Sequence, residues 1–83
     1  MNIHTVTGLH GELVAFIRDE AAEEVENMLC GWAVVRQPAY SFPSRAFSTH
    51  YLYYDSDLNQ CACWGHYDMT LAEAREDVLL RVA

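Results

Sequence analysis

Apolar residues between about Leu9 and Leu29 recur at three- and four-residue intervals. At about 100° per residue these positions fall on one side of a helical wheel. The stripe consists of Leu13, Ile17, Ala21, Val25, Met28 and Leu29. Gly31 follows as a residue that commonly ends helices. The pattern therefore predicts a helix over most of this segment.

A second interpretation of the same segment stays open. Gly11 is a poor helix former, and Phe16 falls on the acidic side of the predicted helix. Glu12–Arg18 could instead form a strand paired with Ile3–Thr7, with a helix only from Asp19. We favour the long helix and keep this hairpin as its alternative.

Three segments after Gly31 have the β-branched and aromatic character of strands. They are Trp32–Val35, Ala46–Tyr54 and Gln60–Tyr67. Pro38 and Pro43 mark a loop between the first two, and residues 55–59 have the composition of a turn. The second and third strands are therefore expected to form a hairpin.

The last segment has the clearest helical signals. Thr70 and Glu73 have the spacing of a capping box, in which each side chain bonds the other residue's backbone amide. An apolar stripe follows at Leu71, Ala74, Val78 and Val82, helped by Leu79. Asp77 and Arg81 are four residues apart and can pair on the surface. Leu80 points away from the stripe.

These elements predict an α+β fold in the order α-β-β-β-α, forming a single small domain over residues 1–83. A three-stranded antiparallel sheet would carry both helices packed on one face. In topology this order resembles the double-stranded-RNA-binding domain. That family grips phosphate through lysines at the start of its last helix. Residues 70–75 contain no lysine here and place Glu73 in the first turn, so RNA binding is not implied.

Composition and charge narrow the possible functions. The chain has 83 residues, a net charge of −7, and five arginines without a lysine against twelve carboxylates. Direct binding to nucleic acid would need the opposite balance. No apolar run approaches the roughly 18 residues of a membrane span. Three cysteines, an odd number, favour the cytoplasm over a secreted disulfide framework.

The predicted first helix would carry a ridge of carboxylates. Glu12, Asp19, Glu23 and Glu26 would lie within about 60° of one another along roughly 20 Å, and Glu20 and Glu24 would broaden the ridge. Such a row can occupy basic channels that normally hold phosphates. A solvated helix face is the alternative, but surfaces made only for solubility usually mix both signs of charge.

Aromatic side chains provide a second candidate surface. Phe47, Tyr51 and Tyr53 alternate along one strand face, and Trp64 joins them in one register of the hairpin. Tyrosine and tryptophan dominate interface hot spots. If the helices cover the opposite face, this surface is open to a partner; the alternative is that this face forms the core.

Metal binding and catalysis have weaker signals. Cys61, Cys63 and His66, with His50 nearby, offer zinc ligands, but a single residue between the cysteines is fewer than structural sites use. Cys63 and His50 could meet as nucleophile and base, yet no third orienting group or oxyanion loop is evident. We therefore expect no enzyme, no cofactor and no metal.

The negative charge, the acidic ridge and the lack of a catalytic motif together resemble phage-encoded anti-CRISPR and related anti-defence inhibitors. The resemblance implies a non-enzymatic inhibitor in the bacterial cytoplasm that binds the basic surface of a nucleic-acid-binding complex, such as a CRISPR–Cas effector. The expected contact residues are Glu12, Asp19, Glu20, Glu23, Glu24, Glu26, Tyr51, Tyr53 and Trp64. The alternatives are a regulatory protein acting as a homodimer and, less favoured, a small zinc-binding module.

Overall fold

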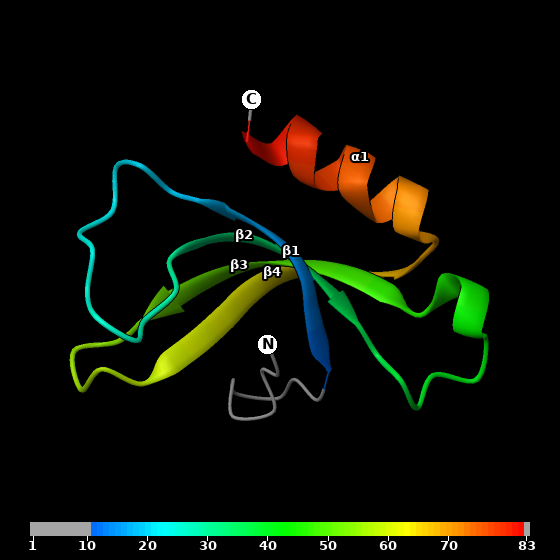
Figure 1. Ribbon diagram of the computed structural model, residues 1–83, viewed down its shortest axis with the longest axis horizontal. Coiled ribbons are helices and arrows are strands. Elements are labelled where there is room, and N and C mark those ends of the chain that lie inside the picture. Colours follow the sequence, from blue (N-terminus) through cyan, green and yellow to red (C-terminus); the bar gives the residue numbers. More distant parts are fainter. Residues whose placement is uncertain (1–10, 83) are drawn as a thin grey trace.

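The computed structural model describes residues 11–82, which form four strands followed by one α-helix. The elements are β1 (Glu12–Arg18), β2 (Gly31–Arg36), a short 3-10 turn (Pro43–Arg45), β3 (Phe47–Tyr54), β4 (Gln60–Met69) and α1 (Leu71–Val82). Consecutive strands pair antiparallel in the order β1-β2-β3-β4. Figure 1 shows α1 lying across one side of the twisted sheet.

The predicted α-β-β-β-α order is wrong, because the sheet has four strands and one helix packs on it. In place of the first helix the chain forms β1 and then a loop over residues 19–30. The topological resemblance to the double-stranded-RNA-binding domain is therefore wrong too, because it required that first helix. The hairpin alternative placed the strand Glu12–Arg18 correctly. However, β1 pairs with β2, and no helix begins at Asp19. The proposed partner Ile3–Thr7 lies outside the described residues.

A β-bulge interrupts the alternation of side chains in β1. The register with β2 shifts between Leu13 and Ala15, so one extra residue, Val14, is inserted into the strand. Leu13 and Phe16 consequently pack against the same cluster although they are three residues apart. An unbroken strand would point residues at this odd spacing to opposite faces. The predicted apolar stripe is divided between the faces, since Leu13 packs against one cluster and Ile17 against the other.

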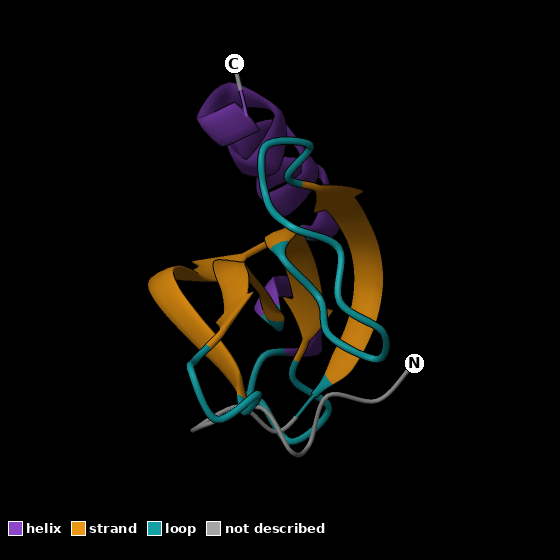
Figure 2. Ribbon diagram, turned by 90° about the vertical axis from the view of Figure 1, so that its left-hand side faces the viewer, coloured by secondary structure: helices purple, strands orange, loops and turns teal. Residues whose placement is uncertain are grey.

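Both faces of the sheet bury apolar side chains. On one face, which we call the helix-side face, Val34 packs with Ala74 and Val78 of α1. On the opposite face, Ala33 and Val35 of β2 pack with Leu52 of β3. The helix covers only the helix-side face, as the curved strands and α1 in Figure 2 show. The core is therefore divided between two small clusters.

The final helix agrees with its sequence signals. Glu73 Oε1 accepts a 2.9 Å hydrogen bond from the amide of Thr70, and the amide of Glu73 donates a 3.2 Å bond to Thr70 Oγ1. The predicted capping box is confirmed. Leu80 is exposed near the end of α1, as expected, but Leu79 is exposed as well, so its predicted contribution to the buried stripe is wrong. This helix, the only α-helix among residues 11–82, is too short and polar to span a membrane.

Gly31 allows β1 and β2 to approach closely at the end of their pairing. Its φ is +155°, and an added Cβ would lie 2.3 Å from the carbonyl oxygen of Ile17. The loop that joins the two strands is fastened at several points. The amide of Asp19 donates to the carbonyl of Cys30 at 2.9 Å, and Gln60 bonds both backbone groups of Leu29 at 2.7 Å. The glycine predicted to end a helix instead begins a strand.

Candidate functional site

Three aromatic side chains from three strands meet on the helix-side face. Trp32 lies opposite Tyr51, with ring centroids 5.1 Å apart in an edge-to-face arrangement. Trp64 of β4 lies 6.1 Å from Trp32 in a stacked arrangement and 5.6 Å from Tyr51. Such pairs contribute about 0.5–1.5 kcal/mol each beyond the burial of their area. We call Trp32, Tyr51 and Trp64 the aromatic cluster.

Trp64 joins this cluster because β4 is bulged. Cys63 lies opposite Tyr51, so regular alternation would point the next side chain to the other face. The register shifts here, and Trp64 has a φ of 54°, a left-handed conformation that is unusual for an aromatic residue. The side chain is 66 % exposed. An exposed tryptophan in an uncommon backbone conformation is a candidate contact residue.

Arg81, in the last turn of α1, holds the helix against the cluster. Its Cζ lies 4.7 Å from the centre of the Trp32 ring. Nη1 donates a 3.2 Å hydrogen bond to Thr49 Oγ1, and Nη2 donates to the carbonyl of Trp64. Nη2 also lies 3.0 Å from Nε2 of His66. One guanidinium thus connects the helix with three strands.

Asp77 completes this network one turn earlier in α1. The Thr49 hydroxyl donates to its Oδ2, and Nδ1 of His66 lies 3.0 Å from its carboxylate. Burial opposes ionisation of Asp77, but these hydrogen bonds and nearby Arg81 outweigh it and hold the pKa of the carboxyl below its ordinary value. Both ring nitrogens of His66 have partners, which fits a structural role for this imidazole.

The loop between β1 and β2 collects most of the carboxylates that we predicted as a contact surface. We call residues 19–30 the acidic loop. Its four glutamates are exposed: Glu20, Glu23, Glu24 and Glu26. The hydroxyl of Tyr54 donates a 3.0 Å bond to the carbonyl of Glu23 and holds the middle of the loop. The charges are therefore displayed on a loop that is attached to the sheet.

Asp19 connects the acidic loop to the aromatic cluster. Its Oδ2 accepts a 2.6 Å hydrogen bond from the Tyr51 hydroxyl, and its Oδ1 accepts a 3.0 Å bond from the amide of Ala21. These two bonds, the first larger in effect, lower the pKa of Asp19. The hydrogen bonds to Asp19 and to the Cys30 thiol raise the pKa of Tyr51. The aspartate therefore stays ionised beside the tyrosine.

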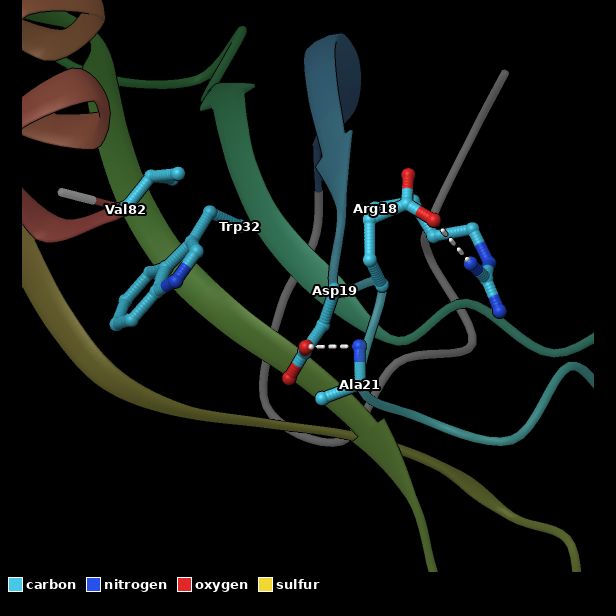
Figure 3. Close-up of a pocket in the computed structure, with 6 residues that line it drawn as sticks. Arg18, Asp19, Ala21, Trp32 and Val82 are labelled. Carbon is cyan, nitrogen blue, oxygen red and sulfur yellow. Dashed lines mark hydrogen bonds and ion pairs between the residues drawn. The ribbon is translucent and has the colours of Figure 1, made fainter.

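A shallow pocket of about 290 Å³ lies where the acidic loop meets the end of α1. It is lined by Arg18, Asp19, Glu20, Ala21, Trp32 and Val82. Figure 3 shows Trp32 and Val82 on one side of this pocket and the Asp19 carboxylate on the other. The pocket thus combines an apolar wall with negative charge.

The structure does not contain the predicted acidic ridge, because no helix carries it. Glu12 lies on β1 and is paired with Arg36 of β2 at 3.0 Å, away from the loop. Glu20 forms a 3.1 Å ion pair with Arg18. The side chains of Glu24 and Glu26 make no hydrogen bond or ion pair with any residue in 11–82. The continuous rod of carboxylates is replaced by an exposed loop.

The predicted aromatic surface is partly reproduced. Tyr51 and Trp64 come together, whereas Tyr53 lies opposite Cys61, is 37 % exposed, and forms no ring contact with either. Phe47 packs beneath α1. Of the two alternatives for this face, each holds for a part of it: α1 covers Phe47, whereas Trp64 and Tyr53 stay exposed.

The proposed cysteine and histidine sites are not assembled. Cys61 and Cys63 lie opposite Tyr53 and Tyr51 and therefore belong to the helix-side face. His50 is buried on the other face, with Nε2 2.8 Å from Ser48 Oγ. Among the described residues no three histidine, cysteine or acidic side chains are grouped to hold a metal ion. The geometry thus provides neither the suggested zinc site nor the Cys63–His50 pair.

Sequence reasoning missed several residues that organise the site. The sequence pattern predicts Trp32 as part of a strand and gives it no functional role. It predicts for Arg81 only a surface ion pair with Asp77. The side chain of Arg81 is 15 % exposed, and its Nε lies 3.8 Å from Asp77, so its principal contacts point inward. The alternation of Trp32 and Tyr51 in their strands was the available signal for the aromatic pair. No spacing in the sequence predicts that Thr49 and His66 contact Asp77 and Arg81.

Comparison of the chain with protein-family models, curated proteins and solved structures finds no match. The functional interpretation consequently depends on the geometry of the site.

Proposed function

We propose that this protein is a non-enzymatic inhibitor that binds the basic surface of a nucleic-acid-binding complex. The observation that carries the proposal is the hydrogen bond between Asp19 and Tyr51, which joins the acidic loop to the aromatic cluster. Charge and aromatic contact area are thereby offered to a partner as one surface. Long-range attraction would guide association, and the aromatic rings would supply contact energy.

The attachment of the acidic loop supports this role. A loop that is ordered before binding loses less conformational entropy when a partner contacts it. Gln60, Tyr54 and Tyr51 each bond this loop from the sheet. The exposed Glu24 and Glu26 are then free to meet partner arginines or lysines. Their carboxylates would occupy positions that phosphates otherwise take.

The resemblance in overall character to anti-CRISPR proteins suggests a CRISPR–Cas effector as the partner. A CRISPR–Cas effector in a bacterial cytoplasm has the required basic nucleic-acid channel. Binding there would block nucleic-acid entry stoichiometrically, without covalent chemistry. Direct binding of the protein to nucleic acid is disfavoured by the net charge of −7.

The test is capture from nuclease-treated bacterial lysate by the immobilised protein, followed by elution with a DNA duplex and mass spectrometry. We expect the eluted proteins to be nucleic-acid-binding complexes. Replacing Glu24 and Glu26 with glutamine should weaken capture about tenfold at low salt, since two exposed charges are removed.

Glu76→Lys provides a matched control. It also changes the net charge from −7 to −5, because one reversal equals two neutralisations, but it lies on the exposed side of α1. Capture by this variant should stay within twofold of the original protein. An equal loss of capture in the double glutamine variant and in Glu76→Lys would show that capture depends on net charge alone. That result would contradict a specific role of the acidic loop.

Homodimer formation is a second candidate function, favoured by the exposed apolar side chains around the end of α1. Leu79 and Leu80 are 64 % and 69 % exposed there. Single exposed leucines are common, but two adjacent ones at one helix end form an apolar patch that a second copy of the chain would cover. Light scattering at several concentrations and salt levels decides between the two. A salt-insensitive dimer favours this candidate, whereas a monomer favours the inhibitor.

A further inference from the structure

The pocket between the acidic loop and α1 has the chemistry to hold one long basic side chain. At about 290 Å³ it lies at the lower end of the roughly 300–1,000 Å³ typical of small-molecule sites. Trp32 and Val82 form an apolar wall along which methylene groups can lie. Asp19 faces this wall from the loop (Figure 3). A side chain with an apolar stem and a cationic end would match both the apolar wall and the Asp19 carboxylate.

The charge of the pocket is unbalanced by one unit. Its lining contains two carboxylates, Asp19 and Glu20, and one guanidinium, Arg18, which leaves a net charge of −1. The Arg18 guanidinium turns away from Trp32 (Figure 3) and bonds Glu20 at 3.1 Å and the carbonyl of Ala22 at 3.0 Å. It therefore leaves the space between Trp32 and Asp19 unfilled. One added cation would neutralise the lining.

Asp19 retains acceptor capacity for such a cation. Each carboxylate oxygen offers about two lone pairs, and within the described chain Oδ2 uses one for Tyr51 and Oδ1 one for Ala21. One acceptor position on each oxygen remains. A guanidinium presents two parallel N–H donors that match the two oxygens of a carboxylate, whereas an ammonium is a single point charge.

We infer that this pocket binds the guanidinium of one arginine on the protein partner, with Asp19 as its counterion and Trp32 and Val82 against its methylene groups. The inference rests on the proposed function, since it names the group through which the basic partner is anchored. It specifies one subsite, whereas the exposed glutamates of the loop supply only long-range attraction.

The test is an NMR titration of the intact protein with acetyl-arginine amide, whose blocked ends leave the guanidinium as its only charge. We expect saturable shifts at the indole Nε1–H of Trp32 and at the backbone amides of residues 19–21. Acetyl-citrulline amide, the uncharged isostere, should bind at least tenfold more weakly. Equal binding of the two compounds, or shifts confined to residues 23–26, would overturn the inference.

Two variants make the test specific. Asp19→Asn removes the charge but keeps an oxygen for Tyr51, and it should weaken arginine binding at least tenfold. Ala21→Leu narrows the pocket without changing charge and should weaken binding at least fivefold. Glu76→Gln removes the same charge from the exposed side of α1, outside the pocket, and should leave binding within twofold. Amide spectra with native dispersion check that each variant is folded.

The experiments distinguish failure of the assigned subsite from failure of the proposed function. Arginine binding that Asp19→Asn does not weaken overturns the assigned subsite even if lysate capture persists. Arginine binding at Trp32 without DNA-displaceable capture supports the subsite and contradicts the proposed partner. Loss of both activities in Asp19→Asn, with both retained in Glu76→Gln, supports the pocket as the anchor.

Discussion

The hydroxyl of Tyr51 donates a 2.6 Å hydrogen bond to Oδ2 of Asp19 and thereby attaches the acidic loop to an interior strand of the sheet. The same tyrosine ring contacts Trp32 and Trp64. Loop position and aromatic packing are thus coupled through one side chain. The exposed charges of the loop owe their placement to a contact between residues 32 positions apart.

Tyr51→Phe should loosen the acidic loop while keeping the aromatic packing. The variant removes a charge-assisted hydrogen bond, so we expect a loss of about 1–2 kcal/mol in the free energy of unfolding. Because the Tyr51 bond is the largest cause of its lowered pKa, Asp19 should then titrate closer to its ordinary value. Urea denaturation and NMR titration of the Asp19 carboxyl measure the two effects. An unchanged Asp19 pKa would contradict the assigned hydrogen bond.

Arg81→Met should weaken the attachment of α1 to the sheet. It removes hydrogen bonds to Thr49 and to the Trp64 carbonyl, so we expect a loss of about 1–3 kcal/mol in the free energy of unfolding. Tryptophan fluorescence should change as well, since the guanidinium leaves the Trp32 ring. The matched control is Arg75→Met on the same helix. Arg75 is exposed and makes no ion pair or hydrogen bond within residues 11–82, so its loss should cost less than about 0.5 kcal/mol.

Gly31→Ala should be strongly destabilising. The new methyl group would lie 2.3 Å from the Ile17 carbonyl, and β1 and β2 would have to separate. We expect a loss of at least about 2 kcal/mol in urea denaturation. Gly65→Ala is the comparison, since the three atoms nearest to its methyl group would all belong to the exposed, rotatable side chain of Tyr67 rather than to backbone. Similar stability of the two variants would contradict the close approach of the strands.

Burial of His50 should make stability fall in weak acid. Burial, with smaller effects from Arg81 and His66, lowers the pKa of this imidazole from about 6.5 to about 4 in the folded protein. Between these values the unfolded chain binds a proton that the folded chain does not, so stability decreases as pH falls from 6.5 to 4. The contribution between pH 7 and pH 4.5 is roughly 2 kcal/mol.

His50→Asn tests this assignment, because asparagine does not titrate and can still bond Ser48. Unfolding free energies measured at pH 7 and pH 4.5 should differ less in the variant than in the original protein. Comparing the two differences cancels any constant cost of the substitution. Equal pH dependence in both proteins would show that another group titrates in this range.

The second half of the fold follows closely from local sequence. The hairpin of β3 and β4 is bounded by residues 55–59, where Asp55 bonds the amides of Asp57 and Asn59 at 2.9 Å. Thr70 and Glu73 form the capping box that starts α1. These features depend on groups within a few residues of one another, so composition and spacing are enough to predict them.

The first strand and the candidate site depend on contacts that spacing does not encode. The bulge at Val14 places Leu13 and Phe16 on one face of the sheet and Ile17 on the other, which neither helical nor strand periodicity predicts. A second bulge turns Trp64 onto the face that Tyr51 occupies. In both places one extra residue reverses which side chains share a face, and the choice is made by pairing with a neighbouring strand.

The acidic surplus, the final hairpin and the capped helix can be predicted from the chain alone, because charge is a sum and turns and caps are local. The position of the charge on the surface depends on tertiary contacts. Pairing of β1 with β2 placed Asp19 within reach of Tyr51, and the last turn of α1 brought Arg81 onto Trp32. Both depend on residues distant in the chain, since the free energy of burying the sheet faces overrides local helical preference.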